Sequence, residues 1–278
     1  MDEPLPPGLY VVATPIGNLA DLSPRAAETL RRADRILAED KRVSAKLLAH
    51  AGARAPMSVY HDHSSESQRA AIVASLGTEA VALISDAGTP LISDPGYKLV
   101  RAARAAGHKV LTVPGPCAAV AALALAGLPT DRFLFLGFLP PKAKARADSI
   151  AEVAAVRATL VLYESGPRLG GTLEALAAQL GAREAAVARE ITKLHEECVT
   201  GTLAELAGRY AGAPPKGEIV IVVGPPAAGE AASDAELDSA LGEALARLSP
   251  SSAAAEVAGR LGVPRKRAYA RALQLAAQ

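Results

Sequence analysis

The first half of the chain alternates between short aliphatic runs and Ala- and Leu-rich stretches of helical length. Strands are predicted at residues 9–14, 34–40, 57–61, 80–85 and 109–115, and helices at residues 23–33, 42–52, 66–77, 96–107 and 118–127. A strand, a helix and a second strand in this order form a crossover, which makes the two strands parallel. Parallel sheets are covered by helices on both faces. Residues 8–128 are therefore predicted to form a parallel α/β domain.

The second half of the chain has a different pattern. Strands are predicted at residues 132–139, 158–165, 184–190, 196–203 and 217–224, and helices at residues 146–157 and 168–181. Because some strands follow one another without a long helix between them, residues 129–224 are predicted to form a mixed α/β domain. A Pro- and Ala-rich linker at 225–234 leads to a small helical domain predicted at residues 235–278.

Composition limits the partners and the compartment of the chain. Lys and Arg total 30 and Asp and Glu total 29, so a polyanion must meet a local basic patch. Two cysteines are too few for a disulfide framework or a metal cluster, and no metal is expected. The acidic start lacks a secretory pattern, and the longest uncharged apolar run, 117–128, is shorter than the about 20 residues that span a bilayer. We expect a cytoplasmic protein with no membrane partner.

Three polar or Gly/Pro-rich loops follow predicted strands of the first domain: TPIGNLAD at 14–21, SDAGTPLISDPG at 85–96 and VPGPCA at 113–118. Ligands of open parallel sheets bind beyond the carboxyl ends of the strands. None of these loops is a GxGxxG or Walker A motif, which disfavours a dinucleotide or a nucleoside triphosphate. They offer backbone groups and the Asp86 carboxylate, which suit a compact ligand of both charge signs, such as one with an amino acid moiety. The alternative is that they are ordinary turns.

Together with other segments, these loops resemble the motifs of the ribosomal RNA small subunit methyltransferase I family, part of the tetrapyrrole methylase superfamily of S-adenosylmethionine enzymes. The matching segments are YVVATPIGNLADLS, AEDKR with KLL, LISDAGTPLISDPG, VPGPCA, EITKLHEE and PPKGEIVIVVG, in this order. The similarity runs from about Gly8 to Gly224, and the tail is similar to the small helical domain often found in the family.

This resemblance implies a fold, a reaction and partners. The fold is the two-domain α/β fold of class III methyltransferases, with S-adenosylmethionine in the cleft between the domains, and the assembly is a homodimer. The reaction is 2′-O-methylation of a cytidine in the decoding region of 16S rRNA, either free or in the small ribosomal subunit.

The resemblance also assigns the cofactor loops. Asp86 is expected to face the ammonium group of the methionine portion or to fix its own loop, and small residues let the backbone approach the cofactor. The residues expected to bind the cofactor are Pro15, Gly17, Asp86, Ala87, Gly88, Thr89, Pro114, Gly115, Ala118, Glu218 and Ile219.

The chain departs from the family pattern at two places. Asp40-Lys41-Arg42 stands where the family usually has Asp-Thr-Arg, and His63-Ser64 stands where it has a His-Asn pair. Both departures are expected to alter contacts with the acceptor and to leave the cofactor loops unchanged.

A ribose 2′-hydroxyl is a poor nucleophile until its proton is removed, and a positioned general base is typically worth about 10²–10⁴-fold. The segment REITKLHEE at 189–197 concentrates ionisable side chains, and we expect it to face the acceptor ribose. The candidate bases are Lys193, His195, Glu196, Glu190 and Asp40. The alternative is that this segment is a solvated loop.

The tail has a local excess of positive charge. Between residues 256 and 278 it contains one acidic residue, Glu256, and five basic residues: Arg260, Arg265, Lys266, Arg267 and Arg271. A helix, a turn at Gly262 and a helix that starts near a proline predict a helix-turn-helix. We expect these five residues, and Arg42 of the first domain, to bind RNA phosphates. The alternative is a solvated helical hairpin.

Two other functions are compatible with the same sequence. One is methylation of a corrin or porphyrin precursor by another enzyme of the superfamily. The other is a non-catalytic RNA-binding or ribosome-assembly factor that keeps the cleft without turnover. The basic tail and the ITKLHEE loop favour RNA over a tetrapyrrole.

Overall fold

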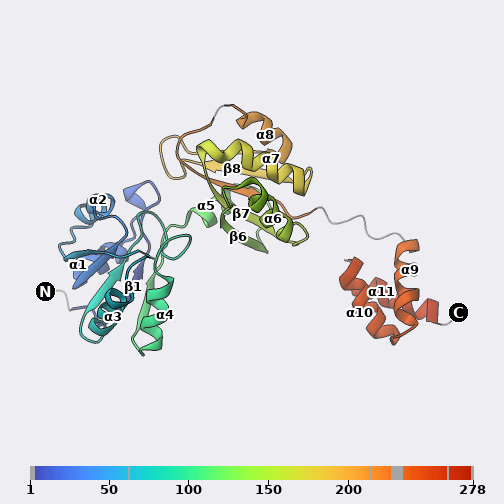
Figure 1. Cartoon of the computed structure of the whole chain (residues 1–278), viewed down its shortest axis with the longest axis horizontal. Helices are drawn as coiled ribbons and strands as arrows, with labels where there is room; N and C mark the ends of the chain where they lie inside the picture. Colours follow the sequence, from blue (N-terminus) through green and yellow to red (C-terminus); the bar gives the residue numbers. More distant parts are fainter. Residues whose placement is uncertain (1–3, 62, 213, 227–233, 262, 277–278) are drawn as a thin grey trace. The chain divides into compact units, whose positions relative to one another are not determined.

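The computed structural model describes residues 4–61, 63–212, 214–226, 234–261 and 263–276. The chain divides into two compact units, Met1–Pro225 and Pro226–Gln278, and Figure 1 shows their elements in sequence colours. Of the linker predicted at 225–234, residues 227–233 lie outside the described residues, as does the turn predicted at Gly262.

The N-terminal sheet of the larger unit is parallel throughout. It consists of β1 (Gly8–Val12), β2 (Arg35–Ala38), β3 (Met57–Val59), β4 (Ala80–Leu83) and β5 (Val110–Val113). The strand order is β3-β2-β4-β1-β5, with β4, β1 and β5 as adjacent strands. The loops that follow these three strands therefore leave the sheet side by side. They are the three loops in which the sequence predicts ligand binding.

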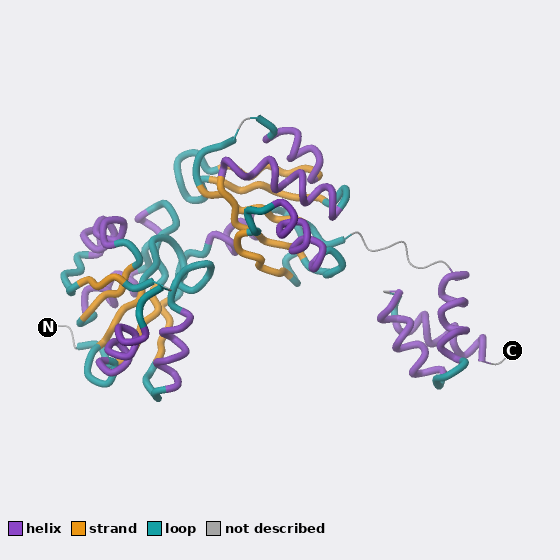
Figure 2. Tube along the Cα trace, in the orientation of Figure 1, coloured by secondary structure: helices purple, strands orange, loops and turns teal. Residues whose placement is uncertain are grey.

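Helices cover both faces of this sheet: α1 (Pro24–Arg32) and α2 (Lys41–Ala51) pack on one face, and α3 (Glu66–Ser75) and α4 (Tyr97–Ala105) pack on the other. The fifth helix of this half, α5 (Ala118–Leu125), follows β5 and packs elsewhere. Figure 2 shows this alternation of orange strands and purple helices along the chain. Local signals set the helix ends, because the Ser23 side chain accepts a hydrogen bond from the Ala26 N–H, and Gly52 ends α2 with a φ of 70°. Leu9 packs on one face of β1, and Tyr10 and Val12 pack on the other. This two-sided burial is typical of a parallel sheet.

The second sheet of the larger unit is mixed, as the sequence predicts. Its order is β6-β7-β10-β8-β9; its strands are β6 (Phe133–Phe138), β7 (Thr159–Ser165), β8 (Glu184–Arg189), β9 (Glu197–Thr202) and β10 (Glu218–Val223). β6 runs parallel to β7, and the other neighbouring pairs are antiparallel. The helices between these strands are α6 (Ala143–Val153), α7 (Leu169–Leu180) and α8 (Leu203–Tyr210).

Helix α8 is absent from the sequence prediction, which ends a strand at residue 203 and places no helix after it. The structure shows why the chain turns helical here. Thr202 and Glu205 form a capping box, in which the Glu205 carboxylate accepts the Thr202 N–H at 2.8 Å and the Thr202 hydroxyl accepts the Glu205 N–H at 3.3 Å. The Thr-x-x-Glu signal is present in the sequence.

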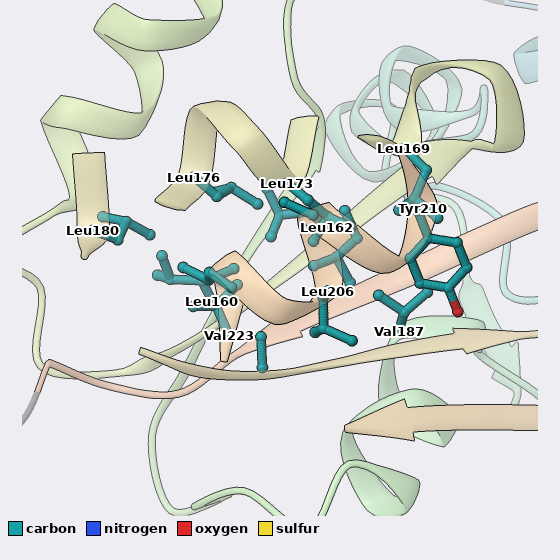
Figure 3. Packing of buried hydrophobic residues seen from close by; sticks show 14 of the residues in the cluster. Leu160, Leu162, Leu169, Leu173, Leu176, Leu180, Val187, Leu206, Tyr210 and Val223 are labelled. Carbon is teal, nitrogen blue, oxygen red and sulfur yellow. The ribbon is translucent and has the colours of Figure 1, made fainter. Parts of the chain in front are cut away.

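The core of the second half lies between its sheet and the helices α7 and α8. Leu162 of β7, Leu173 of α7 and Leu206 of α8 are each no more than 2% exposed, and Figure 3 shows their side chains packing together. On the opposite face of the same sheet, Val161 and Val222 pack in a cluster with residues of α5. Helix α5 of the first half therefore contacts the second sheet, and this contact holds both halves within one unit.

The C-terminal unit is a three-helix domain with its own core. Its helices are α9 (Asp234–Leu245), α10 (Pro250–Leu261) and α11 (Arg265–Ala276). Leu237, Leu241 and Val257 are fully buried together with several alanines. None of the helices in the described residues of the chain is long and apolar enough to cross a membrane.

Candidate active site

A cavity of about 310 Å³ lies where loops of both halves of the larger unit meet. The N-terminal half supplies residues from the loops after β1, β2, β4 and β5, and the C-terminal half supplies residues from β6, β7, β10 and the β8–β9 hairpin. The lining residues used below are Ile16, Glu39, Asp86, Ala87, Gly88, Thr89, Asp94, Ala118, Phe138, Tyr163, Glu190, Lys193, Glu218, Ile219 and Val220.

Hydrogen bonds between backbones join the loops of the first sheet. The Thr14 N–H donates to the Gly88 carbonyl at 2.8 Å, and the Gly88 N–H donates to the Thr14 carbonyl at 3.2 Å. The Thr89 hydroxyl reaches the third loop, where it donates to the Pro116 carbonyl at 2.9 Å. Gly88 has a φ of 83°, a conformation that favours glycine. The three predicted loops are therefore one connected surface.

Carboxylates concentrate around this cavity. Glu39, Asp86, Asp94 and Glu218 all line it. Burial raises the pKa of the Asp94 carboxyl to about 7, and the neighbouring Glu39, Asp86 and Glu218 add to this rise, while a hydrogen bond with Ser85 opposes it. Like charges close together are unfavourable, so the cavity favours a ligand that carries positive charge.

Asp94 and Glu39 are site residues that the sequence analysis missed. Asp94 lies in the same loop as Asp86, as part of its second Ser-Asp pair, and this repetition was the available signal. Glu39 directly precedes the predicted base Asp40. Nothing in the sequence shows that Glu39 faces the cavity and Asp40 does not, because that depends on the fold of the loop.

The hairpin between β8 and β9 closes one side of the cavity. Glu190 and Lys193 line the cavity and form an ion pair at 2.9 Å. The Lys193 chain packs over Gly17, where a Cβ would lie 2.7 Å from Lys193 Cγ. Glu190 and Thr192 have φ values of 51° and 67°, so the hairpin is held in a conformation that side chains rarely adopt. A side chain at position 17 would displace the Lys193 chain from its place over that loop.

Three other predicted bases lie differently. The Asp40 carboxylate caps α2 by accepting the Arg42 N–H at 2.8 Å, and the hydrogen bond from the Arg42 side chain lowers the pKa of Asp40. The Glu196 carboxylate accepts the Thr192 N–H at 2.6 Å, and His195 is exposed. Asp40, His195 and Glu196 are not among the residues that line the cavity, and the two that do are Glu190 and Lys193.

The expected cofactor residues divide in the same way. Seven of them line the cavity: Asp86, Ala87, Gly88, Thr89, Ala118, Glu218 and Ile219. The other four, Pro15, Gly17, Pro114 and Gly115, are not among its lining residues. Gly115 packs closely against Ala13, since a Cβ on Gly115 would lie 3.0 Å from the Cβ of Ala13.

Of the five basic residues predicted to bind RNA in the C-terminal unit, Arg267 lies on α11 and does not line the hollow described below. The other four divide into two groups. Arg271 forms two hydrogen bonds with Asp238 of α9, at 2.5 and 2.6 Å, and Arg260 pairs with Glu243 at 3.5 Å. Arg265 and Lys266 instead line a shallow hollow with Ser251 and Tyr269. In the part of the chain that the structure describes, neither Arg265 nor Lys266 has an ion-pair partner. These two side chains are available to an anion.

Metal ligands do not gather in the described residues, where no group of three His, Cys, Asp or Glu side chains is placed to hold an ion. Cys117 and Cys198 are free thiols. Cys117 is the N-cap residue of α5 and lines the cavity.

Comparison with known proteins assigns the class. Residues 8–207 match the family model of the Tetrapyrrole (Corrin/Porphyrin) Methylases, and residues 231–276 match the RsmI C-terminal HTH domain. The chain belongs to the tetrapyrrole methylase family. Its fold class, a tetrapyrrole methylase fold with a C-terminal helical domain, is confirmed.

Within this family, curated relatives carry one name. The chain is 55% identical to Ribosomal RNA small subunit methyltransferase I of Erythrobacter litoralis, over 98% of this chain and 97% of that protein. It is 49% identical to the protein of the same name from Mesorhizobium japonicum, over 98% and 94%. Among solved structures, uroporphyrin-III-C-methyltransferase from Thermus thermophilus is 25% identical, with a TM-score of 0.55 over 78% of this chain and 93% of that one. The resemblance inferred from the sequence motifs is confirmed.

Two glycines with similar φ values, Gly107 and Gly88, allow the energetic cost of backbone strain to be measured separately from the cost of crowding at the cavity. Gly107 has a φ of 79°, and a Cβ there would meet no atom within 4 Å, whereas a Cβ on Gly88 would lie 3.2 Å from Ile16 Cγ2. We expect Gly107→Ala to lower the free energy of unfolding by about 1–2 kcal/mol, the cost of the left-handed conformation. We expect Gly88→Ala to cost about 1–3 kcal/mol more, because crowding adds to the strain. Urea denaturation measures both, and equal costs would contradict this assignment.

Proposed function

We propose that this protein transfers the methyl group of S-adenosylmethionine to the ribose 2′-hydroxyl of a cytidine in the decoding region of 16S rRNA. The observation that carries the proposal is the carboxylate-lined cavity at the carboxyl edge of the first sheet, in a chain whose curated relatives are named for methylation of small-subunit ribosomal RNA. The cofactor supplies an electrophilic methyl group on a sulfonium.

The charges of the cavity fit this cofactor. S-adenosylmethionine carries a positive sulfonium and an ammonium group, and Asp86 and Asp94 are carboxylates on one connected loop surface. Backbone groups of the loop that contains Gly88 face a compact amino acid portion. Glu218 and Ile219 supply the wall on the side of β10, where the adenine is expected.

We assign the general base to Glu190. Of the five candidates, Glu190 and Lys193 line the cavity, and the Lys193 ammonium group donates a hydrogen bond to the Glu190 carboxylate at 2.9 Å. An ionised carboxylate accepts a proton, whereas an ammonium group does not. In the reaction the 2′-hydroxyl proton passes to Glu190, the 2′-oxygen bonds to the methyl carbon, and the carbon–sulfur bond breaks. Most of the acceleration comes from holding these atoms in line.

We assign the RNA contacts to the shallow hollow that Arg265 and Lys266 of α11 line. Arg265 and Lys266 are free of ion pairs with described residues, whereas Arg260 and Arg271 are held by carboxylates of α9. We therefore propose that Arg265 and Lys266 bind phosphates, and that Arg271 stabilises the three-helix domain. Arg42, whose side chain is 91% exposed, is a further phosphate contact on the first domain, although it pairs with Asp40 at 3.2 Å.

The protein is proposed to be a cytoplasmic homodimer. Apolar side chains on α5 support self-association, because Val120 and Leu125 are 54% and 43% exposed on a helix that is otherwise almost entirely Ala and Leu. Sedimentation equilibrium measures the assembly, and a monomer at micromolar concentration would contradict it.

Two alternatives remain distinguishable by experiment. A tetrapyrrole methylase would accept a porphyrin precursor, as the name of the Thermus structure indicates for that enzyme. A non-catalytic assembly factor would bind small subunits without taking up the cofactor. The basic hollow on α11 favours RNA over a tetrapyrrole.

The decisive assay is transfer of tritium from methyl-labelled S-adenosylmethionine to small ribosomal subunits that lack the modification. We expect one methyl group per subunit, at a site that resists alkaline cleavage because its 2′-oxygen is blocked. Glu190→Gln should lower turnover about 10²–10⁴-fold, whereas the matched change Glu196→Gln, outside the cavity, should lower it far less. Label in a porphyrin precursor but not in rRNA, or no label at all, would contradict the proposal.

Cofactor affinity should depend on pH through Asp94. Its pKa is raised from 3.8 to about 7 in the free protein, so the side chain carries a proton below pH 7 and loses it above. A cationic ligand binds the ionised form better, so its affinity should rise by up to tenfold per pH unit below about pH 7 and level off above. Calorimetry from pH 5.5 to 8 measures this slope.

Asp94→Asn should weaken binding and flatten this pH profile. Asp148→Asn, at an exposed position on α6 that pairs with Lys144, should leave the profile unchanged. Identical profiles for the wild type and Asp94→Asn would remove Asp94 from the binding site.

The assignment of the RNA contacts predicts a specific salt dependence. Arg265→Gln and Lys266→Gln should each weaken binding to small subunits and lower the slope of log affinity against log salt by about 0.7–0.9. Arg260→Gln removes the same charge from a side chain already paired with Glu243, so it should leave the slope unchanged. Fluorescence anisotropy over a range of KCl concentrations measures these slopes. Equal effects of all three changes would contradict the assignment.

A further inference from the structure

Strand β6 contains a bulge next to the cavity. Phe135 pairs with Val161, Gly137 pairs with Leu162 and Phe138 pairs with Tyr163, so β6 has one residue more than β7 over this stretch. Gly137 has a φ of 61°, and a Cβ there would lie 3.0 Å from the Ser93 hydroxyl. The bulge therefore depends on glycine at 137.

The bulge decides which face of the sheet Phe138 occupies. Side chains alternate between the two faces of a strand, so residues 135 and 138 of a regular strand would point in opposite directions. Here both rings contact Tyr163, with ring centroids 4.9 Å from Phe135 and 5.6 Å from Phe138, each pair in an edge-to-face arrangement. The extra residue has moved Phe138 to the cavity face of the sheet.

Phe138, Tyr163 and Val220 form one row across β6, β7 and β10, and all three line the cavity. Val220 on the central strand β10 is 4% exposed, whereas Phe138 on the edge strand is 52% exposed. The backbones of adjacent strands lie about 4.8 Å apart, so the backbone at Phe138 is about 10 Å from the backbone of β10. The adenine is expected beside Glu218 and Ile219 on β10, and this distance separates Phe138 from it.

An exposed phenyl ring is an unusual lining for a cavity rich in carboxylates. Aromatic rings stack on flat, uncharged groups, and proteins that bind unpaired nucleotides use aromatic side chains to stack bases. Tyr163 fixes one edge of the Phe138 ring and leaves the rest accessible. The open end of the cavity thus has a platform that suits a nucleobase.

We infer that Phe138, placed on the cavity face by the bulge at Gly137, is the stacking platform for the acceptor base in the proposed methyl transfer. The inference rests on the proposed function, because the acceptor is taken to be a nucleotide whose ribose enters the cavity. Phe138 acts as a positioning residue: it holds the base so that the 2′-hydroxyl reaches the methyl group. It takes no part in proton or methyl transfer.

The test compares four variants of the full-length protein. Phe138→Ala removes the ring, Phe138→Leu keeps an apolar side chain without it, and Phe138→Tyr keeps the ring. Phe133→Ala is the matched control, because Phe133 lies at the other end of β6, is 48% exposed and is not among the residues that line the cavity. Three quantities are measured: the Kd of S-adenosylmethionine, kcat/KM for unmodified small subunits, and the Kd of a short cytidine-containing oligoribonucleotide with the cofactor bound.

We expect Phe138→Ala and Phe138→Leu to lower kcat/KM and to weaken oligonucleotide binding by roughly 5- to 100-fold, the range for loss of one stacked base. Phe138→Tyr should restore both quantities, and Phe133→Ala should leave both unchanged. The Kd of the cofactor should stay within about twofold of the wild-type value in every variant, because the adenine is expected on β10 and not on the Phe138 ring.

Two results would overturn the inference. Weaker cofactor binding in Phe138→Ala would show that the ring holds the adenine, and wild-type behaviour of Phe138→Leu would show that stacking is not needed. Failure of the proposed function looks different, because the wild type would then transfer no methyl group to small subunits. The oligonucleotide arm would still report whether Phe138 binds a nucleobase.

Discussion

The candidate site depends on a pair of backbone hydrogen bonds between the loops after β1 and β4. Thr14 and Gly88 each donate to the carbonyl of the other, across two neighbouring parallel strands. Glycine at 88 permits the left-handed backbone that brings its N–H and carbonyl into reach. Once these loops are joined, Thr89 reaches the third loop at Pro116. The strand order β4-β1-β5 makes this possible, because only adjacent strands deliver their loops to one place.

Electrostatics then select the ligand. Glu39, Asp86, Asp94 and Glu218 line one cavity, and the pKa of Asp94 is raised first by burial and then by repulsion from the other three carboxylates. A buried carboxyl with a raised pKa destabilises the folded chain, and such groups are common at sites where a bound ligand offsets this cost. In the proposed function, the sulfonium and ammonium groups of S-adenosylmethionine would supply that compensation. The proposed base, Glu190, pairs with Lys193 on the side of the cavity that the β8–β9 hairpin supplies.

Much of this site is predictable from the sequence, and the reasons are physical. Alternation of aliphatic runs and helices predicts parallel strands, parallel strands predict loops at one edge, and the loops with Asp86 and Gly88 are visible as polar breaks. The fold class follows from the same pattern and from the family motifs, and it is confirmed. Ion-pair partners are harder, because Asp238 and Arg271 are 33 residues apart and meet only once α9 and α11 pack.

Other features depend on local geometry that no periodicity reveals. Asp94 faces the cavity because of the conformation of its loop, in which Leu91 and Ser93 also have positive φ values. Phe138 reaches the cavity face because the bulge adds one residue to β6; the regular alternation would place it on the other face. The helix α8 was visible only as a capping box, a signal that a strand prediction over the same residues conceals.

The most direct measurement is a crystal structure of the protein with bound S-adenosylmethionine. We expect the cofactor in the cavity between the loops after β1, β4 and β5 and the strand β10. Its ammonium group should lie within hydrogen-bonding distance of Asp86 or Asp94, and its methyl group should face Glu190. A cofactor bound outside this cavity, or an ammonium group that meets neither carboxylate, would contradict the assignment of the site.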